Sequence, residues 1–163
     1  MMSIPYHHAT VCASFRYYRI LENNKAGSEG GGIYSSKVLT LKDTTVTGNE
    51  ATMSGGAIQI ATADSVFNMS GSTVITEDSS KNDVYLTNKT VITLTDELTA
   101  TGKIARITLN SSGGYQENRV VVKGGVTIPE NYAGKFTITN KPLDPQKWKL
   151  ILNDNELKLK KTK

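Results

Sequence analysis

The sequence predicts an all-β protein, a right-handed parallel β-helix of about four short coils at residues 13–109. An irregular segment at 1–12 precedes the coils, and an antiparallel β cap at 110–163 is expected to follow them. Three observations lead to this prediction. One glycine-rich pattern occurs twice with a spacing of 25 residues, short apolar pairs recur at a similar spacing, and the chain ends in a typical hairpin pattern.

The repeated pattern reads NKAGSEGGGI at 24–33 and NEATMSGGAI at 49–58. A fixed period in this range is typical of a solenoid, in which each repeat is one structural unit stacked on the next. Gly30-Gly31 and Gly55-Gly56 are therefore expected at corners that need a positive φ or a close approach of the backbone.

Two further features of the repeat favour stacking. Gly32 and Ala57 occupy one shared position that requires a small residue. Asn24 (or Asn23) is expected to lie over Asn49 and to form a short amide ladder between coils.

Three apolar positions recur in each coil. Alternating pairs mark one strand: Ala13 and Phe15, Leu39 and Leu41, Phe67 and Met69, Ile92 and Leu94. A second inward position follows five residues later: Ile20, Val46, Val74 and Thr99, with Leu98 beside it. A third closes each coil: Ile33, Ile58, Val84, and then Ile104 with Ile107. Three short strands per coil indicate a parallel β-helix.

Equivalent side chains of such coils lie about 4.8 Å apart, directly above one another. One interior column is expected from Ile33, Ile58 and Val84. A second is expected from Phe15, Leu41, Met69 and Leu94.

After residue 109 the pattern changes. The expected strands of the cap are 119–122, 126–128, 136–139, 148–152 and 157–159. The last two flank Asn153-Asp154-Asn155, which is a typical hairpin turn sequence. A cap is needed because stacked coils leave open sheet edges. Trp148 is expected to be its core anchor.

Composition and charge argue against several classes of function. The hydrophobic content of 37% suits a thin, elongated fold. The net charge of +4 comes from the second half, but Lys158 and Lys160 alternate with leucines and lack interleaved aromatic residues, so we expect the wet face of a strand and no nucleic-acid site. Cys12 is the single cysteine, which excludes an internal disulfide, and we expect it to be a small buried residue.

The sequence contains no apolar run of about 18 residues that would predict a transmembrane helix. Its first residues show neither the apolar core nor the cleavage site of a secretory signal. Because residues from Val11 onward already read as part of a coil, we expect a C-terminal fragment of a longer protein with upstream coils.

No residue pattern predicts catalysis, a metal or a cofactor. His7 and His8 are adjacent and have no ligand partner at a suitable spacing. The loop at 27–32 lacks the GK[ST] ending of a phosphate-binding loop. The acidic pairs Glu77-Asp78 and Asp96-Glu97 are expected at solvated turns about 19 residues apart, and so not at one equivalent position of successive coils, as a catalytic groove would need.

The expected outer surface is polar. Its outward residues are Thr40, Thr45, Thr47, Ser65, Asn68, Thr73, Thr76, Thr93 and Thr95. Such a wall can hydrogen-bond glycans or proteins, and it also meets the ordinary need for a polar strand exterior.

The pattern Asn-x-Ala-x3-Gly-Gly-[Gly/Ala]-Ile, together with FNMSGS at 67–72, resembles bacterial surface β-helix repeats. Similar GGAI tetrads occur in chlamydial polymorphic outer-membrane passenger domains. The NDVYL segment at 82–86 and the late Trp148 are similar to repeat-rich surface proteins of treponemal spirochaetes. The resemblance implies an exported or cell-envelope protein of adhesin-like or structural type, located at the cell surface or outside the cell, and it implies no catalytic residues.

The leading hypothesis is a non-enzymatic surface module that acts as a spacer or adhesin-like scaffold. Its expected partners are a host glycan or an extracellular-matrix protein, with the binding residues unknown. The alternative is a carbohydrate-active β-helix enzyme, which would need a groove with convergent carboxylates. A third hypothesis is that the open N-terminal edge makes the fragment unstable alone, or makes it associate end to end.

Overall fold

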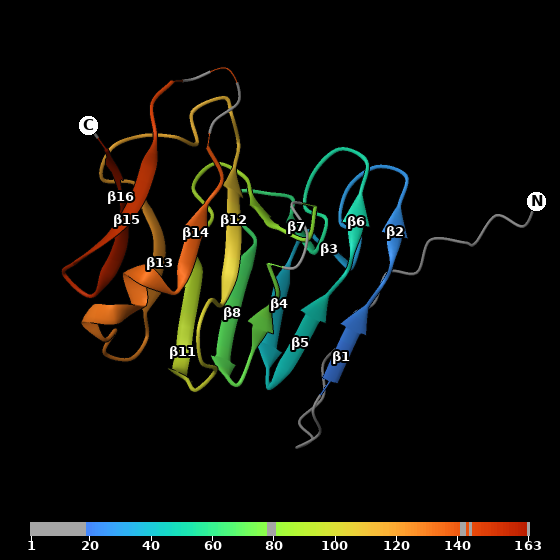
Figure 1. The fold of residues 1–163 in the computed structure, drawn as a ribbon, viewed down its shortest axis with the longest axis horizontal. Coiled ribbons are helices and arrows are strands. Elements are labelled where there is room, and N and C mark those ends of the chain that lie inside the picture. The colour runs from blue at the N-terminus through green and yellow to red at the C-terminus, as the bar shows by residue number, and fades with distance from the viewer. Residues whose placement is uncertain (1–18, 78–80, 141–142, 144, 163) are drawn as a thin grey trace, which may run out of the picture.

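The computed structural model is a parallel β-solenoid of about four turns with an antiparallel hairpin at its C-terminal end, which confirms the predicted fold class (Figure 1). It describes residues 19–77, 81–140, 143 and 145–162. The segment 1–12 and the predicted apolar pair Ala13 and Phe15 lie outside these residues. Figure 1 shows β1 and β2 at one end of the molecule, and β15 and β16 at the other.

Four sheets form the walls of the solenoid. The three-stranded sheet contains β1 (Arg19–Glu22), β5 (Thr44–Thr47) and β9 (Val74–Ile75). The five-stranded sheet contains β3 (Ile33–Ser35), β7 (Ile58–Ile60), β10 (Val84–Leu86), β12 (Ala105–Leu109) and β14 (Phe136–Ile138). The six-stranded sheet contains β4 (Val38–Lys42), β8 (Val66–Gly71), β11 (Ile92–Leu98), β13 (Val120–Gly124), β16 (Glu156–Lys161) and β15 (Trp148–Asn153). A two-stranded sheet joins β2 (Lys25–Ala26) to β6 (Glu50–Ala51).

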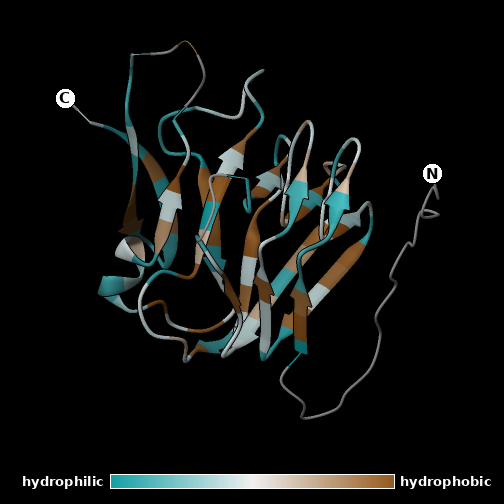
Figure 2. Cartoon of the chain, turned by 45° about the vertical axis from the view of Figure 1, so that its right-hand side comes forward, coloured by the Kyte–Doolittle hydropathy of each residue, from teal (hydrophilic) through white to brown (hydrophobic). Residues whose placement is uncertain are grey.

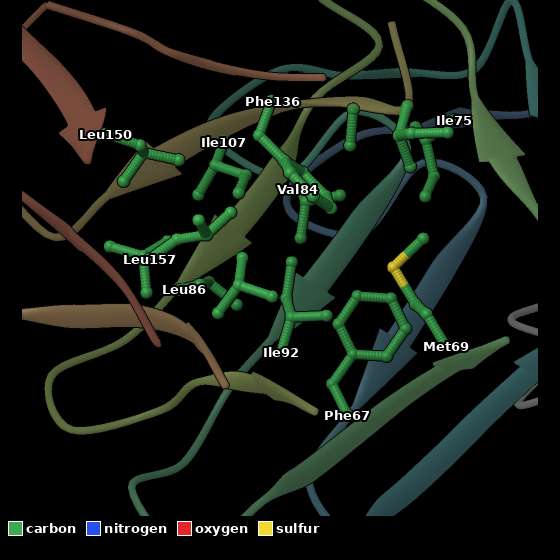
Figure 3. Packing of buried hydrophobic residues seen from close by; sticks show 14 of the residues in the cluster. Phe67, Met69, Ile75, Val84, Leu86, Ile92, Ile107, Phe136, Leu150 and Leu157 are labelled. Carbon is green, nitrogen blue, oxygen red and sulfur yellow. The ribbon is translucent and has the colours of Figure 1, made fainter. Parts of the chain in front are cut away.

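The predicted interior columns are present. Ile33, Ile58 and Val84 stack in register through parallel pairs, and the column continues to Ile107 and Ile138. In the six-stranded sheet Leu41 pairs with Met69, and Met69 with Leu94. Figure 3 shows side chains from these columns converging in one core, and Figure 2 shows hydrophobic and hydrophilic residues alternating along the strands.

The prediction for the three-stranded sheet is wrong by one residue. Leu21, not Ile20, pairs with Val46 and packs on the core, whereas Ile20 is 64% exposed. In the third coil Ile75, not Val74, pairs with Val46 and is fully buried. These pairs, Ile20-Leu21 and Val74-Ile75, are each two adjacent apolar residues, so alternation alone cannot decide which one faces inward.

The fourth coil departs from the prediction in the same sheet. Thr99 is exposed, and Leu98 is buried beside it. Ile104 takes the place above Ile75, which donates its backbone N–H to the Ile104 carbonyl at 2.7 Å. Ile107 alone therefore belongs to the column of Val84.

The glycine pair of each repeat has two different tasks, as expected. Gly30 and Gly55 have φ values of +65° and +63°, which L-residues with a side chain rarely adopt. Gly31 and Gly56 lie where coils approach closely: a Cβ at Gly31 would overlap the carbonyl oxygen of Gly56, and one at Gly56 would overlap that of Lys81. The GG dipeptide thus makes the corner and permits the stacking.

The amide ladder predicted from Asn24 and Asn49 is present and has a third member. Asn24 Nδ2 donates to Asn49 Oδ1 at 2.9 Å, and the backbone N–H of Asn49 donates to Asn82 Oδ1 at 3.1 Å. Asn49 and Asn82 are buried at 1% and 0% exposure. Because all three side chains satisfy backbone groups at the same corner, the ladder joins three coils there.

The expected antiparallel cap at 110–163 is correct only for its last part. β13 and β14 pair in parallel with β11 and β12, so they extend the solenoid beyond residue 109. Residues 126–128 form no strand, and a 3-10 helix η1 (Glu130–Gly134) follows them. The alternation of Val120 to Val122 and Phe136 to Ile138 matches the interior columns, which explains the parallel pairing.

The C-terminal hairpin is present as predicted. β15 and β16 are antiparallel and joined by Asp154 and Asn155, with φ values of 53° and 58°. β16 also pairs antiparallel with β13, so the hairpin covers the last coil of the six-stranded sheet. Trp148 is 8% exposed and lies 6.1 Å from the Tyr115 ring, in agreement with its predicted anchoring role.

Candidate functional site

The outer face of the five-stranded sheet has one aligned row of side chains that the sequence did not mark as a site. Tyr34, Gln59, Tyr85 and Thr108 pair in register on four successive strands. Thr108 Oγ1 lies 2.8 Å from Thr139 Oγ1, and this hydrogen-bonded pair continues the row. Each residue of the first four directly follows an inward residue of the neighbouring column, so its side chain points outward. We call this row the outer column.

The exposure of the outer column varies along its length. Tyr34 is 45% exposed and Tyr85 is half-buried. Gln59 between them is only 3% exposed because the turn at Ser54 and Gly55 folds over it. Ser54 Oγ hydrogen-bonds Gln59 Oε1 at 3.0 Å. The amide is thus held at the base of the column between two tyrosines.

A loop between β12 and β13 closes the column beyond Tyr85. Arg119 holds this loop by donating to the carbonyl oxygens of Gly114 at 2.8 Å, Thr87 at 2.9 Å and Thr90 at 3.3 Å. Tyr115 is 9% exposed and donates its hydroxyl to the Thr139 carbonyl at 2.8 Å. The accessible rings of the column are therefore those of Tyr34 and Tyr85, with the largely buried Gln59 between them.

Buried titratable groups gather around this part of the structure. Burial raises the pKa of Tyr85 and of Tyr115, and it lowers the pKa of Arg119. The acceptors of the Arg119 guanidinium are neutral carbonyl oxygens, so its positive charge has no carboxylate in direct contact among the described residues.

Asp83 lies beside the column, two residues before Tyr85. Burial raises the pKa of its carboxyl, although hydrogen bonds from Thr108 and from the Gly56 backbone act in the opposite direction. The Gly56 N–H donates to Asp83 Oδ1 at 2.9 Å. Asp83 therefore braces the corner at which two coils approach most closely.

The polar wall predicted from the sequence is present in part. Thr40 and Thr95 are exposed, and Thr45, Thr47, Asn68, Thr76 and Thr93 are half-buried. Ser65 and Thr73 were expected outside but are buried at 7% and 0% exposure. Thr73 Oγ1 donates to the Ser70 carbonyl at 2.7 Å, and Ser65 Oγ lies 2.8 Å from Thr62 Oγ1. Both side chains close turns, where a buried hydroxyl finds a partner.

The two acidic pairs have different surroundings. Glu77 is 3.8 Å from Arg106, while Asp78 lies outside the described residues. Asp96 and Glu97 are exposed in β11, at the register shift between Leu94 and Leu98. His7, His8 and Cys12 also fall outside the part of the chain that the structure describes.

Neither a metal site nor a membrane helix is found where the chain is described. Among residues 19–77, 81–140, 143 and 145–162, no three His, Cys, Asp or Glu side chains are grouped to hold a metal ion. No helix in these ranges has the length and apolar character needed to cross a membrane.

The basic C-terminal strand has the expected arrangement. Leu157 and Leu159 are fully buried, and Lys158 and Lys160 lie on the other face. Lys158 Nζ pairs with Glu156 at 3.1 Å, and Lys160 Nζ pairs with Glu117 at 2.9 Å. The lysines are thus compensated locally.

Sequence reasoning missed Tyr34, Gln59 and Tyr85, although their signal was present. Each is the residue after a member of the column Ile33, Ile58 and Val84. An alignment of the repeats by their inward residues therefore also aligns the outward ones. Arg119 and Tyr115 gave no such signal because their loop lies outside the repeat.

Comparison with known proteins supports the repeat assignment. The family model of the Chlamydia polymorphic membrane protein repeat matches residues 20–36 and 43–61. These ranges contain β2, β3, β5, β6 and β7 and the two glycine corners, one before β3 and one before β7. No curated protein and no solved structure matches the chain. Together the repeat match and the fold show a β-solenoid protein with repeats similar to those of the Chlamydia polymorphic membrane protein.

Proposed function

We propose that the chain is a non-enzymatic repeat module of a bacterial surface or outer-membrane protein, acting as an adhesin-like scaffold or spacer. The match to the polymorphic membrane protein repeat supports the cellular location. The observation that carries the binding role is the coil-to-coil register of outward side chains, as in Tyr34, Gln59 and Tyr85. Such rows give a solenoid an extended surface over which binding energy is distributed.

The proposed partners are a host glycan or an extracellular-matrix protein. Both present many hydroxyl, amide or carboxylate groups, which suit walls built from Thr, Asn and Gln side chains. The likeness to treponemal surface proteins and the existence of upstream coils stay predictions. The requirement for those coils is a further prediction.

A binding screen tests the proposal. The purified chain is applied to arrays of glycans and matrix proteins, and the same sample is examined by far-UV circular dichroism. Saturable binding without turnover supports the adhesin-like role, and a folded chain that binds nothing leaves the spacer role. An aggregated chain indicates that upstream coils are required.

One observation favours the alternative of a carbohydrate-active enzyme. Asp83 combines burial with a raised pKa, which is a property of many catalytic acids, and lies next to the outer column. Its contacts to Gly56 and Thr108 nevertheless serve the corner, and a second carboxylate would be required for glycoside hydrolysis. Release of reducing or unsaturated sugar ends in the screen, lost in Asp83→Asn, would establish the enzyme instead.

A further inference from the structure

We propose that Tyr34, Gln59 and Tyr85 form a binding subsite for an extended, neutral β-linked glycan that runs along the solenoid axis. This inference rests on the proposed function and names the surface and the ligand class. It depends on the spacing of the two tyrosines, the state of the Gln59 amide, and the loop that ends the column.

The two tyrosines lie at equivalent positions two coils apart. Tyr34 pairs in register with Gln59, and Gln59 with Tyr85. Two inter-strand spacings amount to about 10 Å, close to the length of a disaccharide unit in an extended β-linked chain. Sugar rings i and i+2 of such a chain present equivalent faces, so they match two aromatic rings at this spacing.

A tyrosine ring combines an apolar face with a polar hydroxyl. The C–H face of a pyranose packs on such a ring, while its hydroxyls remain available for hydrogen bonds. Tyr34 follows the inward Ile33 on a short strand, so it faces outward, and it is 45% exposed. Tyr85 is half-buried and has the Tyr115 and Arg119 loop beside it.

The Gln59 amide provides a hydrogen-bonding group between the rings. One end bonds Ser54 Oγ at 3.0 Å, and the other end has no hydrogen-bond partner among the described residues. Gln59 as a whole is 3% exposed. The Nε2 atom is not among the buried side-chain atoms of the described residues that lack a partner, so it reaches the surface and can donate to a ligand. A sugar hydroxyl or acetamido group between the tyrosines would supply that partner.

The loop held by Arg119 defines one end of the subsite. Its contacts to Thr87 and Thr90 fix it against the chain segment after β10. Tyr115 is 9% exposed, and its hydroxyl accepts from the Leu109 N–H and donates to the Thr139 carbonyl at that end of the sheet. A glycan is therefore directed from Tyr85 toward Tyr34 and away from the hairpin.

The test measures binding of cellotetraose and chitotetraose to the full chain by isothermal titration calorimetry. We expect binding of at least one tetramer, weaker binding of its monosaccharide, and at least a tenfold rise in Kd for Tyr34→Ala and for Tyr85→Ala. Tyr85→Phe keeps the ring and is expected to retain affinity within about threefold. Val38→Ala and Val66→Ala, at exposed positions of the six-stranded sheet, are the matched controls and are expected to leave Kd unchanged, while Asn68→Ala tests the polar wall of that sheet.

Circular dichroism of each variant separates loss of binding from loss of folding. Tyr34→Ala is the decisive variant because its side chain is exposed and its strand ends the sheet among the described residues. No binding of either tetramer to the folded chain overturns the inference, while binding to matrix proteins in the screen leaves the proposed function intact. Tetramer binding that Asn68→Ala abolishes and Tyr34→Ala preserves also overturns it, because the contact then lies on the other wall.

Discussion

The backbone N–H of Asn49 donates to the side-chain Oδ1 of Asn82 in the next coil at 3.1 Å. The two residues are 33 positions apart in the chain, which is longer than the period of 25 residues that relates Asn24 to Asn49. The ladder therefore keeps its register although the third coil contains extra residues. Corners of this solenoid are fixed by specific hydrogen bonds as well as by apolar columns.

Replacing Asn49 should remove a joint between three coils. Its Oδ1 accepts from Asn24 Nδ2, and its Nδ2 donates to the carbonyls of Leu21 at 2.9 Å and Thr47 at 3.0 Å. Asn49→Ala removes the four hydrogen bonds that the Asn49 side chain makes at this part-buried corner, and we expect the free energy of unfolding to fall by about 2–3 kcal/mol. Urea denaturation followed by circular dichroism measures the change.

Asn68→Ala is the control for the ladder. Asn68 is half-buried, and its side-chain amide donates to Thr40 Oγ1 at 3.2 Å on the surface. We expect a loss below about 1 kcal/mol. Equal effects of the two substitutions would contradict a special role for the ladder.

Alanine substitution is expected to have opposite effects on stability at two glycines of the repeat, one at a close approach of two coils and one in open space. A Cβ at Gly56 overlaps the Lys81 carbonyl oxygen, so Gly56→Ala should force the coils apart and lower the free energy of unfolding by about 3 kcal/mol or more. At Gly27 a Cβ meets nothing within 4 Å, so Gly27→Ala should stabilise by about 0.4–1 kcal/mol through the unfolded chain. Thermal unfolding of both variants tests the pair, and a stable Gly56→Ala protein would disprove the close approach.

The interior columns of the five- and six-stranded sheets were predictable because their residues alternate cleanly. Ile33, Ile58 and Val84 each have a polar or aromatic neighbour on the next position, so the inward residue is unambiguous. Ile20-Leu21 and Val74-Ile75 offer two apolar residues in a row, and there the register came only from the pairing with Val46. In such cases the pairing with the neighbouring coil decides which of the two apolar residues faces the core, and the residues adjacent in the sequence do not reveal that choice.

The end of the solenoid could not be predicted for a different reason. The repeat of glycines and asparagines stops near residue 110, but the columns continue through Val122 and Ile138. Beyond residue 110 the corner sequences differ from those of the repeats, whereas the strands still contribute inward residues to the same columns. The outer column was missed because alternation identifies inward residues and treats all outward ones alike, although Tyr34 and Tyr85 differ from the Thr-rich rows.

The covering role of the hairpin leads to a prediction with a matched control. Leu157 is fully buried and pairs with Val122 of the last coil and Leu152 of the hairpin. Leu157→Ala should lower the free energy of unfolding by about 2–5 kcal/mol. Leu143→Ala makes the same chemical change at a fully exposed side chain and should change stability by less than about 0.5 kcal/mol. If both variants unfold at the wild-type urea concentration, the hairpin does not stabilise the solenoid.

The raised pKa of Asp83 predicts how stability depends on pH. Burial places the folded-state pKa of this carboxyl above its unfolded value of about 3.9. Between the two values the folded chain holds a proton that the unfolded chain has released, so this group lowers stability as pH rises through that window. The penalty is absent below the unfolded pKa and complete above the folded pKa.

Asp83→Asn removes this penalty while Oδ1 keeps its hydrogen bond from the Gly56 backbone. We expect the variant to match the wild type near pH 3 and to be more stable than the wild type at pH 7, as measured by urea denaturation at a series of pH values. Glu50→Gln is the control of opposite sign, because Lys81 and then Lys25 lower the pKa of Glu50. For this pair, the free energy of unfolding of the wild type should rise relative to that of the variant as the pH increases and Glu50 ionises. An Asp83→Asn protein that loses stability relative to the wild type at neutral pH would show that the ionised carboxylate, despite its burial, is required to hold the Gly56 corner.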